Sequence, residues 1–160
     1  MHLSSYFKTI SYSSSIKMRL RIYLFPVILL FLLSLSGCIN RKGAQVTAGI
    51  DLKQFHKFYV VKFGPDNRGI NRLIMDELLK RGFEASTGLV NIRPKDVGAI
   101  VTYQDKWKWD MTMYMIELKI FFREPETQKL LASGESYHSS FSRNSPEEMV
   151  SEVLSNIFSK

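Results

Sequence analysis

Cysteine and histidine are both scarce in this sequence, which limits how the protein can be stabilised and what chemistry it can do. The chain of 160 residues contains one cysteine, Cys38, and three histidines. A single cysteine excludes a disulfide within the chain, so a folded domain must depend on its hydrophobic core. The only histidines after Cys38 are His56 and His138, whereas a metal site normally needs three or four ligands. The sequence therefore predicts no metal site and no metal cofactor.

Acidic residues are absent from residues 1–37, and no apolar run in the chain is long enough to span a bilayer. The longest such run, residues 22–35, is shorter than the ~20 residues that a spanning helix needs. It follows a basic segment that carries Lys8, Lys17, Arg19 and Arg21. A basic flank, a short apolar run and then small residues are typical of a secretory signal peptide. The part that starts at Met18 forms a complete signal peptide by itself, so Met18 is a second candidate for the start of translation.

The single cysteine lies directly after this run. The tetrapeptide Leu35-Ser36-Gly37-Cys38 resembles the lipobox of bacterial lipoproteins, in which small residues precede an invariant cysteine. The resemblance implies removal of residues 1–37 and a covalent lipid on Cys38, which would be the only cofactor. Two or three acyl chains anchor a protein stably in a membrane. Because Ile39 and not Asp follows the cysteine, the resemblance implies the periplasmic face of the outer membrane.

The net charge is modest once residues 1–37 are removed. Four of the 22 basic residues and none of the 15 acidic residues lie there, so the formal charge falls from +7 to +3. A charge this small is weak evidence for a nucleic-acid partner, and an export signal argues against one. We therefore expect a membrane partner, through the lipid, and an envelope protein partner. The sequence does not define the oligomeric state.

The rest of the chain predicts one α+β domain over residues 51–160, joined to Cys38 by a polar tether at residues 38–50. Alternating or β-branched segments predict strands, apolar residues at helical spacing predict a first helix that starts near Ile70, and Ser145-Pro146-Glu147-Glu148 predicts the start of a second helix. The expected fold is a single small sheet with two helices packed on it. Its order is β-α-β, a three-strand antiparallel meander and a C-terminal helix, with strands at 57–63, 83–89, 99–109, 112–123 and 130–139.

This element order, the export signal and the stretch VTYQDKWKWDMTMY at residues 101–114 resemble uncharacterised proteobacterial lipoproteins. The domain also resembles the small α/β domains of envelope proteins such as the TolB amino-terminal domain and the LpoB and CsgG groups. The resemblance brings no catalytic motif with it.

The most unusual stretch of the domain contains Tyr103, Asp105, Trp107 and Trp109. Strand alternation places both tryptophans on one side, flanked by Asp105 and Asp110. If exposed, they form a platform for a sugar ring or for an apolar patch of a partner, since tryptophan is frequent at binding hot spots. If covered, they pack between the sheet and a helix, which is the commoner fate of strand aromatics.

Two chemical interpretations of the same region are weaker. Asp105 and Asp110 fall on opposite faces of a regular strand, whereas glycoside hydrolysis needs two carboxyl groups that face each other across a cleft. Met111, Met113 and Met115 recur at strand spacing, and we expect them to pack in the core or at an edge.

The sequence therefore predicts a non-enzymatic lipoprotein that acts as an adaptor or assembly factor in the bacterial cell envelope. The alternative is a periplasmic module that binds a glycan or small ligand through Trp107 and Trp109. A hydrolase acting on envelope material is the third hypothesis and lacks a catalytic constellation.

Overall fold

The computed structural model describes residues 40–64 and 66–160. The predicted signal peptide, Met18, the lipobox Leu35–Gly37 and the lipidation site Cys38 lie outside the described residues. The chain divides into two compact units, and the second, Ile39–Lys160, is the one described here. Its principal hydrophobic cluster runs from Leu52 to Ile157, so this unit has a core of its own.

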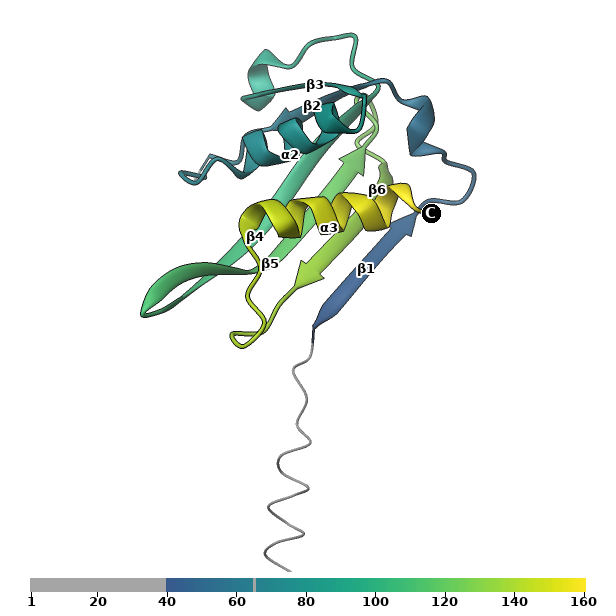
Figure 1. Cartoon of the computed structure of the whole chain (residues 1–160). Helices are drawn as coiled ribbons and strands as arrows, with labels where there is room; N and C mark the ends of the chain where they lie inside the picture. The colour runs from purple at the N-terminus through teal and green to yellow at the C-terminus, as the bar shows by residue number, and fades with distance from the viewer. Residues whose placement is uncertain (1–39, 65) are drawn as a thin grey trace, which may run out of the picture. The chain divides into compact units, whose positions relative to one another are not determined.

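One mixed sheet of six strands organises this unit, in the spatial order β1-β6-β5-β4-β2-β3 (Figure 1). The central strand β4 pairs in parallel with β2, which pairs in parallel with β3. On its other side β4, β5, β6 and β1 are successively antiparallel. The strands are β1 (Arg41–Val46), β2 (Lys57–Val61), β3 (Glu84–Gly88), β4 (Ala99–Asp110), β5 (Thr112–Arg123) and β6 (Leu130–Tyr137).

The α+β class was predicted correctly, but the predicted sheet was wrong. The antiparallel part has four strands and not three, because Arg41–Val46 of the expected tether forms the edge strand β1. The sequence RKGAQV lacks a row of large apolar residues, since only Ala44 and Val46 pack against the core and both are small. The strand forms because its backbone pairs with β6, and its side chains carry no strand pattern that the sequence could show. Residues 41–46 of the expected tether therefore belong to the folded sheet.

The two helices follow the predicted signals. Helix α3 (Pro146–Phe158) starts with a complete capping box, in which Ser145 and Glu148 bond each other's backbone N–H groups. Helix α2 (Ile70–Lys80) is followed by Gly82, whose φ of 87° is the left-handed conformation that favours glycine. Gly69 is the N-cap of α2, but the Asp66 carboxylate accepts from the N–H groups of Arg68 and Gly69 and so satisfies the helix start.

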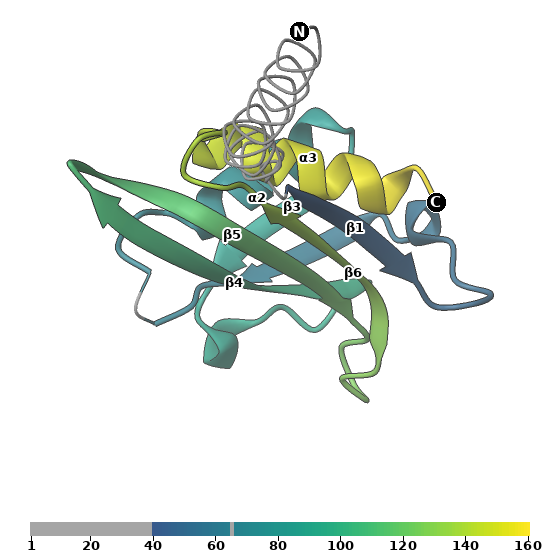
Figure 2. The same cartoon turned by 90° about the horizontal axis from the view of Figure 1, so that it is seen from below.

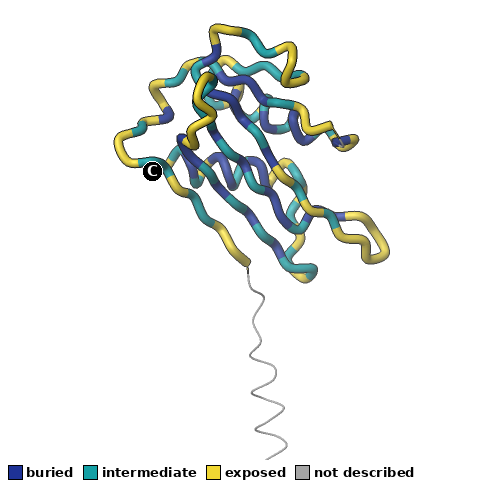
Figure 3. Tube along the Cα trace, turned by 180° about the vertical axis from the view of Figure 1, so that it is seen from behind, coloured by how far each residue is buried: buried dark blue, intermediate teal, exposed yellow. Residues whose placement is uncertain are grey.

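Both helices cover the same face of the sheet (Figure 2). On the other face, Tyr59, Val97 and Ile100 form a small second cluster at the parallel strands, and the antiparallel strands are left open. On the covered face Phe58 packs edge-on against Phe83 and Phe122, and Phe158 of α3 stacks on Phe83. Gly134 of β6 allows α3 to approach, because a Cβ there would lie 2.8 Å from Ile157 Cγ1. Two short 3-10 turns, η1 (Leu52–Gln54) and η2 (Val90–Ile92), lie in the connections. Buried residues follow the middle of the strands, whereas exposed residues gather at the β4–β5 turn and in the loops (Figure 3).

Candidate functional site

The open face of the sheet is hollowed between its antiparallel strands. A groove of about 420 Å³ lies across β1, β6, β5 and β4. Gly43 on β1 leaves room at one side, and the half-buried ring of Phe121 supplies apolar surface. The remaining side chains of the lining are mostly polar or charged: Gln45, Gln104, Lys119, Ser133 and Glu135. The groove therefore combines one aromatic contact with several hydrogen-bonding groups.

Charged side chains form a ladder beside this groove. Glu117, which is buried, pairs with Lys106 on β4 and with Lys119 on its own strand. Lys119 also lies 3.8 Å from Glu135 of β6. The hydrogen bond from Lys106 is the main reason that the pKa of Glu117 lies below its usual range. The ladder is a fixed pattern of charges across three neighbouring strands.

The predicted residue Tyr103 is buried on the opposite, helix-covered face. Its hydroxyl donates to Asp66 Oδ2 at 2.6 Å and accepts from the N–H of Phe63 at 3.2 Å. Burial, together with the bond to Asp66, raises the pKa of Tyr103 well above its usual range. Burial would also raise the pKa of Asp66, but the bonds from Tyr103 and from three backbone N–H groups hold it below the usual range. Tyr103 therefore holds the loop before α2 in place and does not belong to an exposed surface.

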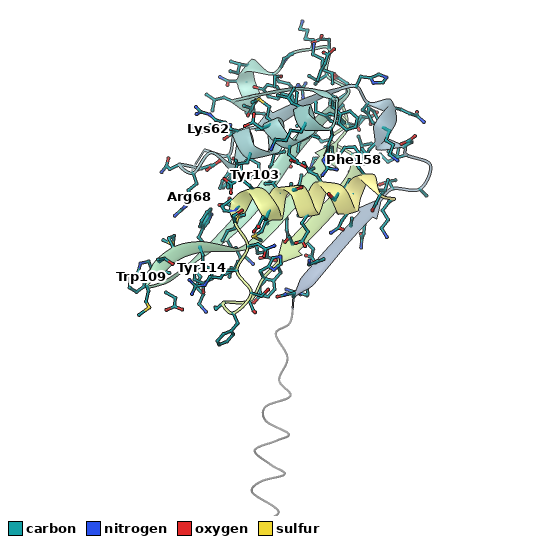
Figure 4. All side chains as sticks on the ribbon, viewed as in Figure 1. Lys62, Arg68, Tyr103, Trp109, Tyr114 and Phe158 are labelled. Carbon is teal, nitrogen blue, oxygen red and sulfur yellow. The ribbon has the colours of Figure 1, made fainter. Side chains whose placement is uncertain are left out.

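The two tryptophans have different environments: Trp107 is partly covered and Trp109 is exposed. Trp107 packs against the core, donates its indole N–H to Asp105, and lies under Arg68, whose guanidinium is 4.3 Å from the ring centroid. Trp109 is 71% exposed near the end of the β4–β5 hairpin (Figure 4). Of the predicted binding residues, the structure therefore brings half-buried Asp105 and Trp107 together, and only Trp109 is largely exposed to solvent.

A register shift between Lys106 and Trp107 alters the far half of the hairpin. Lys106 faces Glu117 and Trp107 faces Met115, so Ile116 is the extra residue. Met115 consequently takes a core position, whereas Met111 and Met113 are exposed. Core packing was thus correct for Met115 only.

Among the remaining candidates for chemistry, His138 and Asp110 make structural bonds. His56 is exposed, and buried His138 contacts Glu152 Oε2 through Nε2 at 2.9 Å. Ser136 donates to the same oxygen, and Lys42 of β1 pairs with the other one. This cluster joins β1 and β6 to α3. Asp110 is bonded by Arg143 and not by Asp105.

Within residues 40–64 and 66–160, no group of three or more histidine, cysteine or acidic side chains is arranged to hold a metal ion. In the same described residues, no helix is both long and apolar enough to cross a membrane.

Sequence reasoning missed several residues that matter for the surface. Arg68 and Arg143 each lie over an aromatic ring, but both come from loops whose position depends on the tertiary fold. Phe141 is 93% exposed in the β6–α3 loop. The signal in the sequence is a lone phenylalanine among serines in the segment SSFSR.

Comparison with solved structures identifies the fold but not a family. PelC from Paraburkholderia phytofirmans, solved as a dodecamer, matches with a TM-score of 0.55 and 13% identity over 72% of this chain and 96% of that one. At this identity the likeness shows a shared fold alone. No protein-family model and no curated protein matches the sequence.

Two further solved structures are more distant. A PDZ domain protein from Parabacteroides distasonis matches with a TM-score of 0.45 and 13% identity, over 75% of this chain and 36% of that one. A minor lipoprotein from Acinetobacter baumannii matches with a TM-score of 0.35 and 11% identity, over 66% of this chain and 91% of that one. These three structures are of bacterial proteins, and one of the three is named as a lipoprotein.

Proposed function

We propose that this protein is a lipid-anchored adaptor of the bacterial cell envelope, which binds another envelope protein and catalyses no reaction. The lipobox resemblance at Leu35–Cys38 supports a lipid on Cys38 and a position on the periplasmic face of the outer membrane. The PelC fold supports a role in assembly, since that protein was solved as a dodecamer.

The observation that carries the proposal is the open face of the sheet. The helices α2 and α3 cover only one face, and the other presents the groove beside Phe121 together with the ladder of Lys106, Glu117 and Lys119. An antiparallel sheet is stable with one polar face in water, so openness alone defines no site. Here the face adds a hollow, an aromatic contact and fixed charges of both signs, which are the elements of a specific polar interface.

Site-specific crosslinking in cells tests this face. A photoreactive phenylalanine analogue in place of Phe121 should capture one envelope protein, because this side chain lines the groove. The same analogue at Leu79, exposed on α2 on the other side of the sheet, is the matched control and should capture nothing specific. Equal capture from both positions, or none from Phe121, would count against a partner at the groove.

The lipid anchor needs its own test. Labelled palmitate should enter the wild-type protein, whereas Cys38→Ser should abolish the labelling and release the protein from the membrane fraction. Wild-type protein that stays at the membrane without incorporating palmitate would refute the lipid anchor. The crosslinking result would not be affected.

A second candidate is binding of a cell-wall glycan or small ligand, and the exposure of Trp109 favours it. A sugar ring that stacks on this indole should shift the tryptophan fluorescence when cell-wall fragments are added. An unchanged spectrum over a range of fragments would remove this candidate.

A further inference from the structure

Seven of the ten large apolar side chains that are exposed among the described residues fall into two groups, one at residues 89–92 and a larger one at one end of the sheet. We call this group the hairpin end: the turn Trp109–Met113 between β4 and β5, together with Phe141 in the β6–α3 loop. Trp109 is 71% exposed, Met111 90%, Met113 51% and Phe141 93%. Four large apolar side chains in water at one end of a small domain indicate a contact surface.

Arg143 joins the two parts of the hairpin end into one surface. Its guanidinium donates to Asp110 Oδ2 at 3.1 Å and to Thr112 Oγ1 at 3.3 Å, and lies 4.0 Å above the Tyr114 ring. Tyr114 also bonds Ser140 in the same loop. The β6–α3 loop is therefore fastened to the side of the hairpin.

The turn itself departs from the usual sequence preference. Met111 has a φ of 58°, a conformation for which glycine or asparagine is the common choice. A methionine that is 90% exposed at such a position stabilises neither the turn nor the core. A local rule broken without a structural gain is a feature of functional sites.

The chain that leads to Cys38 enters at this same end. The Asn40 side chain donates to Ser142 Oγ at 3.1 Å and accepts from the N–H of Ser139 at 3.3 Å, so Asn40 lies against the loop that carries Phe141. A lipid on Cys38 would be attached only two residues before Asn40, and two residues of chain span at most about 7 Å. In Figure 1 the start of β1, the β6–α3 loop and the hairpin turn lie toward the same end of the sheet.

The charges of the hairpin end suit a bilayer surface. Lys108 lies one residue before Trp109 and is exposed, whereas Lys106 is paired with Glu117. The carboxylate of Asp110 is neutralised by Arg143. Tryptophan beside basic residues is the composition found at the boundary between headgroups and acyl chains.

We propose that the hairpin end docks on the bilayer, with Trp109, Met111 and Phe141 at the headgroup boundary and Lys108 at the lipid phosphates. Docking would orient the domain so that its groove stays accessible to a partner. This inference takes its orientation from the lipid anchor of the proposed function, but the contact itself requires no lipid on the protein.

Fluorescence provides a direct test, because Trp107 and Trp109 are the only two tryptophans in the chain. The unit Ile39–Lys160, without lipid and with Trp107→Phe, retains Trp109 as its only indole. The probe is a set of vesicles of phosphatidylethanolamine and phosphatidylglycerol with bromine-labelled acyl chains. Docking predicts a blue shift and quenching of the Trp109 emission by the brominated lipid. An unshifted, unquenched emission would overturn the proposal.

A pair of double variants tests whether the hairpin end makes the contact. Met111→Ser with Phe141→Ser should weaken vesicle binding by about tenfold for each side chain removed. The matched control is Val90→Ser with Ile92→Ser, which removes two exposed apolar side chains from η2, away from the hairpin end. Its binding should equal that of the parent. An equal loss in both pairs would refute a specific contact, as would quenching that persists in the first pair.

The two proposals fail separately. If Cys38 proves unlipidated but the unit still binds vesicles, the anchor is wrong and the docking surface stands. If Cys38 is lipidated and the unit ignores vesicles, the docking surface is wrong and the anchor stands.

Discussion

The two faces of the sheet are built from the same strands, yet they differ in almost every physical respect. On the covered face, Phe58, Phe122 and Ile120 are fully buried beneath α2 and α3. On the open face, neighbouring positions of the same strands present Phe121, Lys119 and Gln104 around the groove. Because strand residues alternate, each strand contributes to stability with one set of side chains and to a surface with the other. A comparison of adjacent residues can therefore separate the two roles.

The largest contrast should come from two consecutive phenylalanines on β5. Phe122→Ala leaves a cavity in the cluster with Phe58 and Phe158, and should lower the free energy of unfolding by about 3–5 kcal/mol. Phe121→Ala removes a half-buried ring from the groove and should cost roughly 1 kcal/mol. Urea denaturation of both variants measures the difference. Equal losses would mean that the open face is covered in the folded protein.

Two glycines on paired strands sharpen the same comparison. A Cβ at Gly134 would lie 2.8 Å and 2.9 Å from atoms of Ile157, so Gly134→Ala should push α3 away and cost about 2 kcal/mol. At Gly43 the nearest atom to a Cβ would be Glu135 Cγ at 3.8 Å, which is ordinary contact. Gly43→Ala should therefore change stability by less than about 0.5 kcal/mol. Thermal unfolding of the two variants gives the answer, and a large loss at Gly43 would contradict the open face.

The covered face was the part that the sequence could predict. The helices carry strong local signals, such as the capping box at Ser145 and Glu148, and the long strands alternate clearly. Strand β1 was missed because an edge strand with one open face and small core residues has no apolar pattern. The register shift at Lys106 and Trp107 was missed because it depends on pairing between strands, and it moved Met115 into the core in place of Ile116.

The candidate site was harder to predict for the same reason. Tyr103, Trp107 and Trp109 share one strand, but helices and loops from elsewhere in the chain decide which of them is covered. Asp66 and Arg68 in the β2–α2 loop cover the first two, and nothing among the described residues covers Trp109. Alternation predicts which side chains of a strand share a face. The tertiary fold determines which of those side chains are covered by helices and loops from elsewhere in the chain.

Two tyrosines on opposite faces test the polar contacts of each side. Tyr103→Phe removes a hydrogen bond to the ionised Asp66 and should cost about 1.5 kcal/mol or somewhat more. Tyr59→Phe removes a bond of 2.8 Å to the carbonyl of Leu89 and should cost about 1 kcal/mol or less, because the acceptor is neutral. Chemical denaturation at neutral pH ranks the two. The reverse order would show that Asp66 is satisfied without Tyr103.

The smallest effect compares two glutamates as the pH falls. Burial would raise the pKa of Glu152, but bonds from Lys42, Ser136 and His138 hold it below the ordinary value of 4.5. A lowered pKa in the folded state stabilises the protein fully above about pH 4.5, and that stabilisation is lost as the pH falls through the folded value. Glu152→Gln should therefore reduce the loss of stability that occurs as the pH falls below about 4.5. Glu117→Gln should act with the same sign, since Lys106 lowers the pKa of Glu117.

Salt separates these two glutamates. The partners of Glu117 are lysines with 69% and 35% of their side chains exposed, so added salt should screen most of its effect. Glu152 is also held by buried Ser136 and His138, so its effect should persist. The free energy of unfolding as a function of pH, measured at low and at high ionic strength for each variant, gives both effects. If salt removed both effects alike, the Glu152 cluster would be a surface ion pair and would not be a buried link between the edge strand and α3.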